Sequence, residues 1–337
     1  MNWDMAYLMR VATGYWPAAA LIAAVELGVF EALAGGAELD SSDLAPKLQA
    51  DPRALTELLD ALAALEALDR TPAGAYRIAP GAADLLDPAR PGSQVEALRY
   101  NRDLYPLWGK LGDAVRAGAP VIPPAAHLGA DPGRTRRFAL GMHSRALGLA
   151  PLLLPVFRCP PEDSDGTFRL LDIGAGPGTF SRLLAEGDAR LWVVQLDLAP
   201  VLAVARELAA DSPAAGRISF QPADYRSDSF AGPMDGALYC GALHQESPET
   251  AAALFRKIVG VLRPGGHIWV VDLMTAPGRR GPLMAHLFSL NMLLTSSRGR
   301  VFAEDDVAGL LTDSGFVNPA VRRCEPAPYS VIEARAP

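Results

Sequence analysis

The stretch Leu170–Thr179 reads LLDIGAGPGT and combines an apolar run, an acidic residue and a glycine-rich turn. Because glycine has no Cβ, such a turn can bend sharply and let a ligand approach the backbone. Its spacing is G-x-G-x-G, and Thr179 stands where the dinucleotide fingerprint G-x-G-x-x-G has its last glycine. The Gly-Lys-Ser/Thr of a phosphate loop does not follow. The turn therefore disfavours both a nicotinamide dinucleotide and a nucleoside triphosphate.

Aspartates stand at the ends of three successive predicted strands. Asp172 precedes the glycine turn, where a carboxylate suits a ligand with a cationic centre better than a pyrophosphate. Asp197 follows the next strand, where a carboxylate can accept both hydroxyls of a ribose. Asp224 and Tyr225 follow the third strand, and they suit the amine and the face of a purine. A ligand with a positive centre, a ribose and an adenine but no phosphates is S-adenosylmethionine, so we expect this cofactor.

Strands and helices alternate after residue 167. Apolar runs predict strands over 168–173, 191–196, 218–222, 236–242 and 267–272, and a terminal pair around 319–323 and 329–333. Helical patterns cover 179–186, 199–210, 248–262 and 303–314. This alternation predicts an α/β fold with a doubly wound, Rossmann-like sheet covered by helices on both faces.

The first 94 residues predict helices followed by a short hairpin. Apolar spacing predicts helices over 17–33 and 43–48, the second capped by Ser41 or Ser42, a third after Asp51, and strands over 68–70 and 76–78. This order is typical of a winged helix. Between Glu38 and Asp69, however, eight residues are acidic and only Lys47 and Arg53 are basic. A recognition helix of that charge would repel phosphates, so we expect an oligomerisation or substrate-covering domain rather than DNA binding.

Residues 95–160 predict a helical linker that contributes to the substrate pocket. Turn-rich stretches at 118–124 and 129–133 interrupt it, and a helix over 134–157 follows. Pro151 and Pro155 should kink or shorten the end of that helix. The predicted division is therefore a winged-helix-like domain (1–94), this linker (95–160) and a cofactor-binding catalytic domain (161–337).

Composition narrows the class of protein further. The 337 residues include 31 Lys and Arg against 38 Asp and Glu, a net charge of −7, which disfavours nucleic acid as a partner. The three cysteines have no CxxC spacing, so neither a disulfide framework nor a zinc site is expected. The start of the chain lacks a signal-peptide pattern, and no run approaches about 20 uninterrupted apolar residues. We therefore expect a cytoplasmic protein without metal or membrane partners.

Taken together, these segments resemble the small-molecule O-methyltransferase family that includes caffeic acid, acetylserotonin and bacterial polyketide methyltransferases. AAALIAAVELGVFEAL and DLAPKLQADPRALTELLDAL resemble its dimerisation domain. LLDIGAGPGTFSRLL, LRPGGHIWVVDLM and FSLNMLLTSSRGR resemble its cofactor-binding and C-terminal motifs. The resemblance implies a homodimer formed through the N-terminal domain and S-adenosylmethionine as cofactor. The expected cofactor-binding residues are Asp172, Gly174, Gly176 and Gly178 for the methionine end, Asp197 for the ribose, Asp224 and Tyr225 for the adenine, and Leu198 and Cys240 beside them.

The resemblance also assigns a general base. The family has a histidine after the fourth strand, usually followed by Asp-Trp, and here His244 is followed by Gln245 and Glu246. Histidine, with an unperturbed pKa near ~6.5, can take a proton from a phenol at neutral pH. Asp272 matches the first of two acidic residues that orient this histidine in the family. The second falls near Val301, which cannot do so, and leaves Glu304 as a substitute.

Acceptor and chemistry are less constrained by the sequence. We expect in-line methyl transfer to a hydroxyl of a small aromatic or polyketide-type acceptor, and the candidates for its pocket are Trp108, Met142, His143, Phe288, Asn291 and Met292. The change after His244 leaves C- or N-methylation, decarboxylation, hydroxylation or a pericyclic reaction as alternatives. A metal-assisted variant would need His286 as a second ligand, and a winged-helix ligand-sensing regulator is a further alternative. The remaining histidines, His127 and His267 among them, are expected to be structural.

Overall fold

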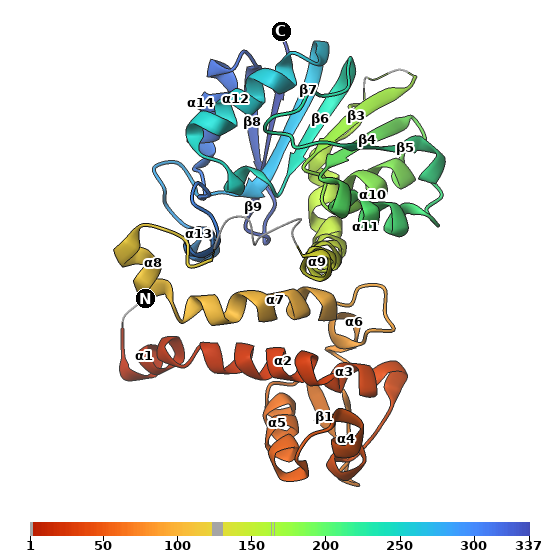
Figure 1. The fold of residues 1–337 in the computed structure, drawn as a ribbon, viewed down its shortest axis with the longest axis vertical. Coiled ribbons are helices and arrows are strands. Elements are labelled where there is room, and N and C mark those ends of the chain that lie inside the picture. The colour runs from red at the N-terminus through yellow and green to blue at the C-terminus, as the bar shows by residue number, and fades with distance from the viewer. Residues whose placement is uncertain (1–2, 123–130, 163, 165) are drawn as a thin grey trace. The chain divides into compact units, whose positions relative to one another are not determined.

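The computed structural model describes residues 3–122, 131–162, 164 and 166–337 of the chain (Figure 1). The chain divides into two units, Met1–Pro106 and Leu107–Pro337. The three-part division expected from the sequence stays a prediction. Both expected interruptions of the helical segment lie partly outside the described residues, and His127 lies outside them altogether.

The N-terminal unit contains helices packed around a two-stranded hairpin. Its elements are α1 (Met5–Ala12), α2 (Tyr15–Leu27), α3 (Val29–Ala32), the 3-10 helix η1 (Ala34–Gly36), α4 (Ser41–Leu48), α5 (Pro52–Ala64), β1 (Leu68–Arg70), β2 (Tyr76–Ile78) and α6 (Ala83–Leu86), and α7 (Val95–Trp108) begins in it. The strands are antiparallel, with Leu68 opposite Ile78. Apolar side chains of α2, α3, α4, α5 and the hairpin form one core. Both hairpin strands have the bounds that the sequence predicted.

Local chemistry explains where two predictions in this unit were wrong. The helix predicted over 17–33 is split at Gly28, whose φ of 82° lies in the left-handed region that a helix cannot contain. The helix α4 is capped by Asp40, which accepts a hydrogen bond from the Asp43 backbone at 2.9 Å, rather than by one of the two serines that follow. Asp51 caps α5 as expected, accepting from Ala54 at 2.8 Å. The helix α1 has no counterpart among the predicted elements.

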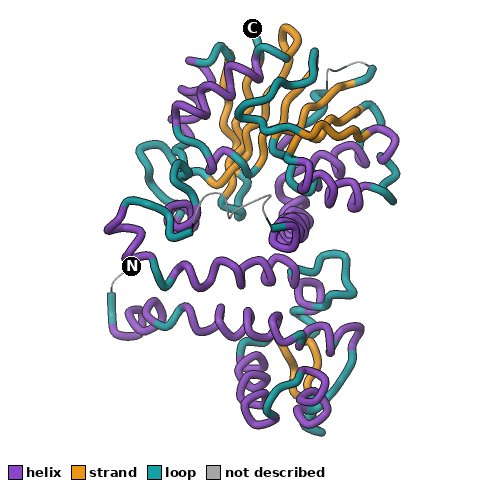
Figure 2. The backbone as a smooth tube through the Cα atoms, viewed as in Figure 1, coloured by secondary structure: helices purple, strands orange, loops and turns teal. Residues whose placement is uncertain are grey.

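The second unit is built on a seven-stranded sheet (Figure 2). Its strands are β3 (Phe168–Ile173), β4 (Leu191–Asp197), β5 (Ile218–Pro222), β6 (Met234–Cys240), β7 (Leu262–Leu273), β8 (Val317–Arg323) and β9 (Tyr329–Arg335). The order is β5-β4-β3-β6-β7-β9-β8; β3 to β7 are parallel, and β9 is antiparallel to both of its neighbours. The predicted α/β class is confirmed.

Helices cover both faces of this sheet. The described helices of the second unit are α8 (Leu111–Ala117), α9 (Pro132–Phe157), α10 (Thr179–Gly187), α11 (Ala199–Ala209), α12 (Pro248–Val259), α13 (Leu283–Thr295) and α14 (Glu304–Asp313), with the 3-10 turns η3 (Ala215–Arg217) and η4 (Leu243–Gln245). Of these, α8 and α13 contact each other rather than a face of the sheet. One core joins the sheet to α9 and α10, and the other joins it to α12 and α14. The two separate cores place the helices in layers on opposite faces of the sheet.

Several element boundaries in this unit differ from the predictions. The strand β6 runs over 234–240 rather than 236–242, and β7 begins at Leu262, where the sequence predicted that α12 still continued. Pro151 and Pro155 do not shorten α9, which continues to Phe157. The buried Leu153 and Phe157 belong to the core against the sheet, and this burial offsets the backbone hydrogen bonds that the prolines remove.

Among the described residues, two helical stretches, Met5–Leu27 and Pro132–Phe157, are long and apolar enough to cross a membrane by length and composition alone. Neither is an uninterrupted apolar run, which is why the sequence pattern did not mark them. The second stretch is α9, whose end is buried against the sheet. The first is divided into α1 and α2 at Thr13 and Gly14. Such stretches are weak evidence for a membrane span, and the cytoplasmic location stays a prediction.

Candidate active site

The strand order of the sheet reverses between β3 and β6. From β3 the chain moves outward to β4 and β5, and it then returns to the other side of β3 for β6 and β7. In open parallel sheets, ligands bind at the carboxyl ends of the strands beside such a reversal. The glycine turn follows β3 and His244 follows β6, so both lie at this position.

The glycines of the turn have different surroundings. Gly174, Gly176 and Gly178 all have positive φ, at 63°, 57° and 66°. A Cβ on Gly178 would lie 2.1–2.3 Å from the end of the Gln195 side chain, whereas a Cβ on Gly176 would meet nothing within 4 Å. Gln195 is buried and donates to the Gly178 carbonyl at 2.9 Å. The turn is therefore packed tightly against β4 at Gly178, whereas at Gly176 it leaves space for a ligand.

Asp172, the acidic residue before the turn, is 3% exposed. Burial raises its pKa to about 7, and the charge of Asp197 nearby adds to this rise. Within the described part of the chain, this carboxyl forms no ion pair. A cationic group of a ligand would stabilise its ionised form.

Asp197 at the end of β4 holds the glycine turn in place. Its two carboxylate oxygens accept hydrogen bonds from the backbone of Gly176 and of Leu198, both at 2.7 Å. Burial raises the pKa of this carboxyl as well. Each oxygen keeps a second lone pair, so the contacts to the turn leave acceptor capacity for ligand hydroxyls.

The remaining expected cofactor residues lie in the loop after β5 and at the end of β6. Asp224 accepts from the Arg226 backbone at 2.9 Å and so caps its own turn. The Tyr225 ring lies against the glycine turn, because its Cε1 is 3.4 Å from where a Cβ on Gly174 would stand. Burial raises the pKa of the Cys240 thiol well above its usual range, so this thiol is not ionised at neutral pH. Tyr225 and Gly174 are thus brought together, as the sequence predicted for one site.

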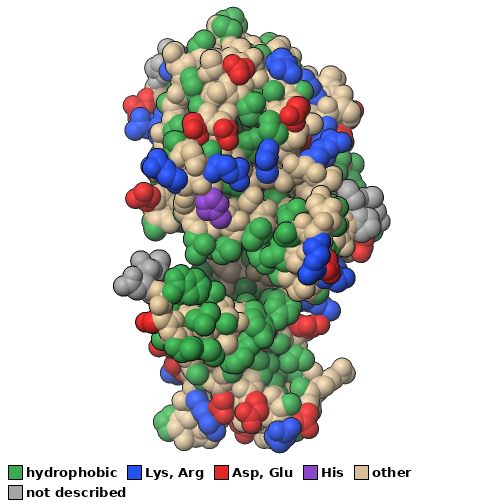
Figure 3. Space-filling model, turned by 90° about the vertical axis from the view of Figure 1, so that its left-hand side faces the viewer, with side chains coloured by type: hydrophobic (Ala, Val, Ile, Leu, Met, Phe, Trp, Pro, Cys, Tyr) green, Lys and Arg blue, Asp and Glu red, His purple; other side chains and the backbone are tan. Residues whose placement is uncertain are grey.

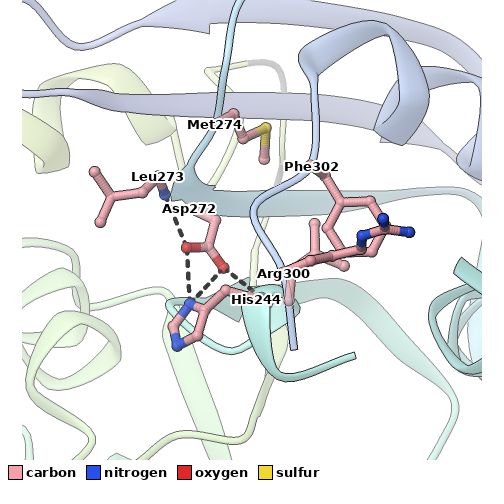
Figure 4. Close-up of a pocket in the computed structure, with 7 residues that line it drawn as sticks. His244, Asp272, Leu273, Met274, Arg300 and Phe302 are labelled. Carbon is pink, nitrogen blue, oxygen red and sulfur yellow. Dashed lines mark hydrogen bonds and ion pairs between the residues drawn. The ribbon is translucent and has the colours of Figure 1, made fainter. Parts of the chain in front are cut away.

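The partly buried His244 and the buried Asp272 form a pair (Figure 4). Nδ1 of His244 lies 2.9 and 3.1 Å from the two carboxylate oxygens, and the His244 backbone donates to the same carboxylate at 3.1 Å. The Leu273 backbone also donates to it, at 2.8 Å. Because a carboxylate can only accept, Nδ1 carries a proton and Nε2 is left as an acceptor. Ser247 caps α12 as predicted, so the histidine lies in the short turn η4 between β6 and that helix.

A small pocket adjoins this pair, and it is lined by Leu243, His244, Asp272, Leu273, Met274, Arg300 and Phe302. The backbone of Arg300 donates to the His244 carbonyl at 2.9 Å. Glu304, the alternative partner of His244, contacts other residues, because its carboxylate binds Arg323 at 2.7–2.8 Å and the Ser330 hydroxyl at 2.7 Å. Asp272 rather than Glu304 therefore supports the histidine.

Some of the expected acceptor residues meet at His244, and others do not. The Phe288 ring lies edge-on to the imidazole of His244, with 4.8 Å between the ring centroids. One turn further along α13, the sulfur of Met292 lies 3.9 Å from the amide nitrogen of Gln245. Asn291 is half-buried on the same helix. His143, on α9 with Met142, instead lies 2.8 Å from the Thr179 hydroxyl at the start of α10. Trp108 is partly exposed at the end of α7.

Two residues of this region escape prediction from the sequence. Gln195 lies inside β4, and Glu246 stands two residues after His244. Neither belongs to a motif that predicts the contact of Gln195 with the glycine turn or of Glu246 with Tyr225. Among the described residues, no group of three or more His, Cys, Asp or Glu side chains is placed to hold a metal ion.

Comparison with known proteins identifies relatives over most of the chain. Residues 108–317 match the model of the O-methyltransferase domain, and residues 9–87 match the O-methyltransferase dimerisation domain. The chain is 29% identical to the tetracenomycin polyketide synthesis 8-O-methyl transferase of Streptomyces glaucescens, over 92% of this chain and 91% of that protein. It is 30% identical to the acetylserotonin O-methyltransferase of Mus musculus, over 98% of this chain and 89% of that protein. The solved structure of human N-acetylserotonin methyltransferase with S-adenosylmethionine superposes with a TM-score of 0.88 at 28% identity, covering 99% of both chains.

Proposed function

Because this chain belongs to the O-methyltransferase family and uses S-adenosylmethionine, we propose that it methylates a hydroxyl of a small aromatic or polyketide-type natural product, with His244 as general base. The observation that carries the proposal is the His244–Asp272 pair beside the glycine turn. The proposed substrate class is taken from the relatives, whose names give a polyketide, a naphthoate, an aminohydroxybenzoate and acetylserotonin as substrates.

The residues at the glycine turn fit the cofactor. The open face of Gly176 gives a ligand access to the backbone, and the buried Asp172 carboxyl lacks a cationic partner in the described chain. We assign Asp172 and the glycines to the methionine end, Asp197 and Leu198 to the ribose, and Asp224, Tyr225 and Cys240 to the adenine side. When bound, S-adenosylmethionine supplies a methyl group activated by a positively charged sulfur.

His244 removes the acceptor's proton in this proposal. Asp272 fixes the imidazole with the proton on Nδ1, so Nε2 is free to take the hydroxyl proton as the oxygen becomes nucleophilic. Asp272 also stabilises the imidazolium that results, because its carboxylate stays beside Nδ1. Phe288 packs edge-on to the ring and restricts its rotation. We place Phe288, Asn291 and Met292 in the acceptor pocket and keep Trp108, Met142 and His143 as further candidates.

The test is transfer of a labelled methyl group from S-adenosylmethionine to a panel of hydroxylated aromatic acceptors, with identification of the methylated atom. For His244→Ala we expect turnover to fall by about 10²–10⁴-fold, as for a lost general base, while cofactor affinity stays the same. Unchanged turnover would remove the base assignment. A product methylated on carbon or nitrogen would favour the alternative that the Gln245 and Glu246 replacements leave open.

We also propose that two copies associate through the N-terminal unit. The match to the dimerisation domain supports this, as do the apolar side chains that gather on the surface of the N-terminal unit (Figure 3). Exposed apolar side chains near the start of the chain are those of Trp3, Met5, Leu8, Met9, Val11, Tyr15 and Trp16. We expect sedimentation to report a dimer at micromolar concentration and Trp16→Asp to shift it towards the monomer. The matched control is Trp192→Asp, which removes an exposed tryptophan of the other unit and should leave the dimer intact. A monomeric wild-type protein would contradict the proposal.

A further inference from the structure

One buried carboxylate, that of Glu246, connects the loop after β5 to the turn after β6. Its side chain is 1% exposed. Oε1 accepts a hydrogen bond from the Tyr225 hydroxyl at 2.8 Å and another from Nε of Arg226 at 2.9 Å. Glu246 stands two residues after His244, and its backbone donates to the Leu243 carbonyl at 2.9 Å, which closes the turn η4. A single residue therefore fixes two loops that lie at the same edge of the sheet.

Tyr225 is held at both of its ends. Nζ of Lys257 donates to its backbone carbonyl at 2.7 Å, and Glu246 accepts from its hydroxyl. Between these anchors the ring packs edge-on to Tyr239, with centroids 5.9 Å apart, and against Gly174 of the glycine turn. The ring consequently has one orientation, with its position set relative to the turn.

Stability alone does not account for a carboxylate at this position. Taking an ionised carboxylate out of water is costly, and a well-packed apolar side chain is often as stabilising. Its other oxygen, Oε2, is buried and has no hydrogen-bond partner among the described residues. The protein thus keeps a costly buried group whose contacts are concentrated on Tyr225 and Arg226.

We infer that Glu246 is a positioning residue for the adenosine half of the cofactor, which acts by holding the Tyr225 ring as a wall beside the glycine turn. The inference rests on the proposed function, because it takes the glycine turn as the cofactor site. It requires no contact between the side chains of Glu246 and His244. The expected signature is a loss of affinity for any ligand that carries the adenosine, whether or not the methionine portion is present.

The experiment measures calorimetric affinity for two probes, S-adenosylhomocysteine and 5′-methylthioadenosine, the second of which lacks the amino-acid portion. We expect Glu246→Ala to weaken both by about tenfold, the loss typical of a hydrogen bond to a charged acceptor. Tyr225→Phe keeps the ring and removes only the hydroxyl, so it should lower both affinities to a similar degree. Since the two side chains act through one contact, the double variant should lose little more than either single variant.

Two further variants serve as controls. Glu246→Gln keeps an oxygen that can accept from Tyr225 and should bind both probes within about threefold of the wild type. Glu249→Ala removes a nearby acidic side chain that is exposed at the start of α12, and it should change neither affinity. If Glu246→Ala does not fold, Tyr225→Phe and Glu246→Gln still decide the question.

The outcomes separate this inference from the proposed function. Wild-type protein that binds neither probe would overturn both. Wild-type protein that binds both probes, with Tyr225→Phe and Glu246→Ala binding equally well, would overturn the inference alone. A loss confined to S-adenosylhomocysteine would also overturn it, because the effect would then belong to the methionine end.

Discussion

Asp172 and Asp272 lie on the two strands that flank β6, and both carboxyls are buried, with exposures of 3% and 2%. Asp272 accepts hydrogen bonds from the backbone and the ring of His244 and from the Leu273 backbone. Asp172 forms no ion pair within the described residues, and burial raises its pKa to about 7. Two aspartates near the ends of strands therefore differ in one respect: Asp272 has a side-chain partner within the chain, and Asp172 has no ion-pair partner among the described residues.

The contrast separates a group whose partner belongs to the protein from a group whose partner is expected to arrive with the ligand. Asp272 and His244 form a complete unit within the chain, so its geometry exists before anything binds. Asp172 has no ion-pair partner among the described residues, and we expect a cationic ligand to supply its counter-charge. We therefore expect substitution of Asp272 to affect turnover and substitution of Asp172 to affect binding.

The largest expected effect is that of Asp272→Asn on turnover. The asparagine amide can donate to Nδ1 and so favours the tautomer with the proton on Nε2, and in that tautomer His244 cannot act as the proposed general base. We expect kcat to fall by about 10³–10⁴-fold. Rates are measured at saturating cofactor and acceptor. Adding His244→Ala should cause little further loss, because the two residues act as one unit; two independent losses that multiply would contradict the pairing.

A smaller effect is expected on cofactor affinity as a function of pH. The proton on Asp172 must leave before its carboxylate can face a positive charge, so affinity for S-adenosylmethionine should rise with pH up to about 7 and then level. The rise should approach about tenfold per pH unit below that pKa. Asp172→Asn should bind more weakly at pH 8 and show a flat profile. Calorimetry over the pH range provides the measurement, and a wild-type profile as flat as that of the variant would argue against Asp172 as the cationic contact.

The smallest expected effect concerns stability without cofactor. The folded-state pKa of Asp172 lies above the ordinary value of 3.8, so the folded protein keeps a proton that the unfolded chain releases. Its contribution to the free energy of unfolding is therefore present below about pH 4 and is lost as the pH rises through about 7. Asp172→Asn lacks this loss and should be more stable than the wild type at pH 8, by on the order of 1–3 kcal/mol. Urea denaturation at both pH values tests the difference, which should vanish near pH 4.

The sequence predicts the elements that depend on local pattern. The strands β3 and β5 have the predicted bounds, and the hairpin after α5 does too, because apolar runs bounded by turn residues mark strands directly. His244 is predicted at the correct edge of the sheet because Ser247 and Pro248 mark the start of the next helix. The predicted pairing of His244 with Asp272 agrees with the observed distances.

Contacts between side chains that are far apart in the chain could not be predicted from the sequence. Glu304 was the substitute that the sequence left for a second acidic partner of His244, but it binds Arg323 and Ser330 from the terminal strands, a pairing that only the sheet order produces. The contact of Glu246 with Tyr225 joins positions 21 residues apart and has no spacing that would mark it. The break at Gly28 is hidden in the sequence because apolar residues continue on both sides of it.

The close approach of Gln195 to Gly178 has a consequence for redesign. A Cβ at position 178 would fall where the glutamine amide already lies, and the φ of 66° at this position separately disfavours every residue except glycine. A shorter residue at position 195 would relieve only the first of these constraints. Engineers who wish to reshape the loop should therefore keep Gly178 and vary other positions of the loop.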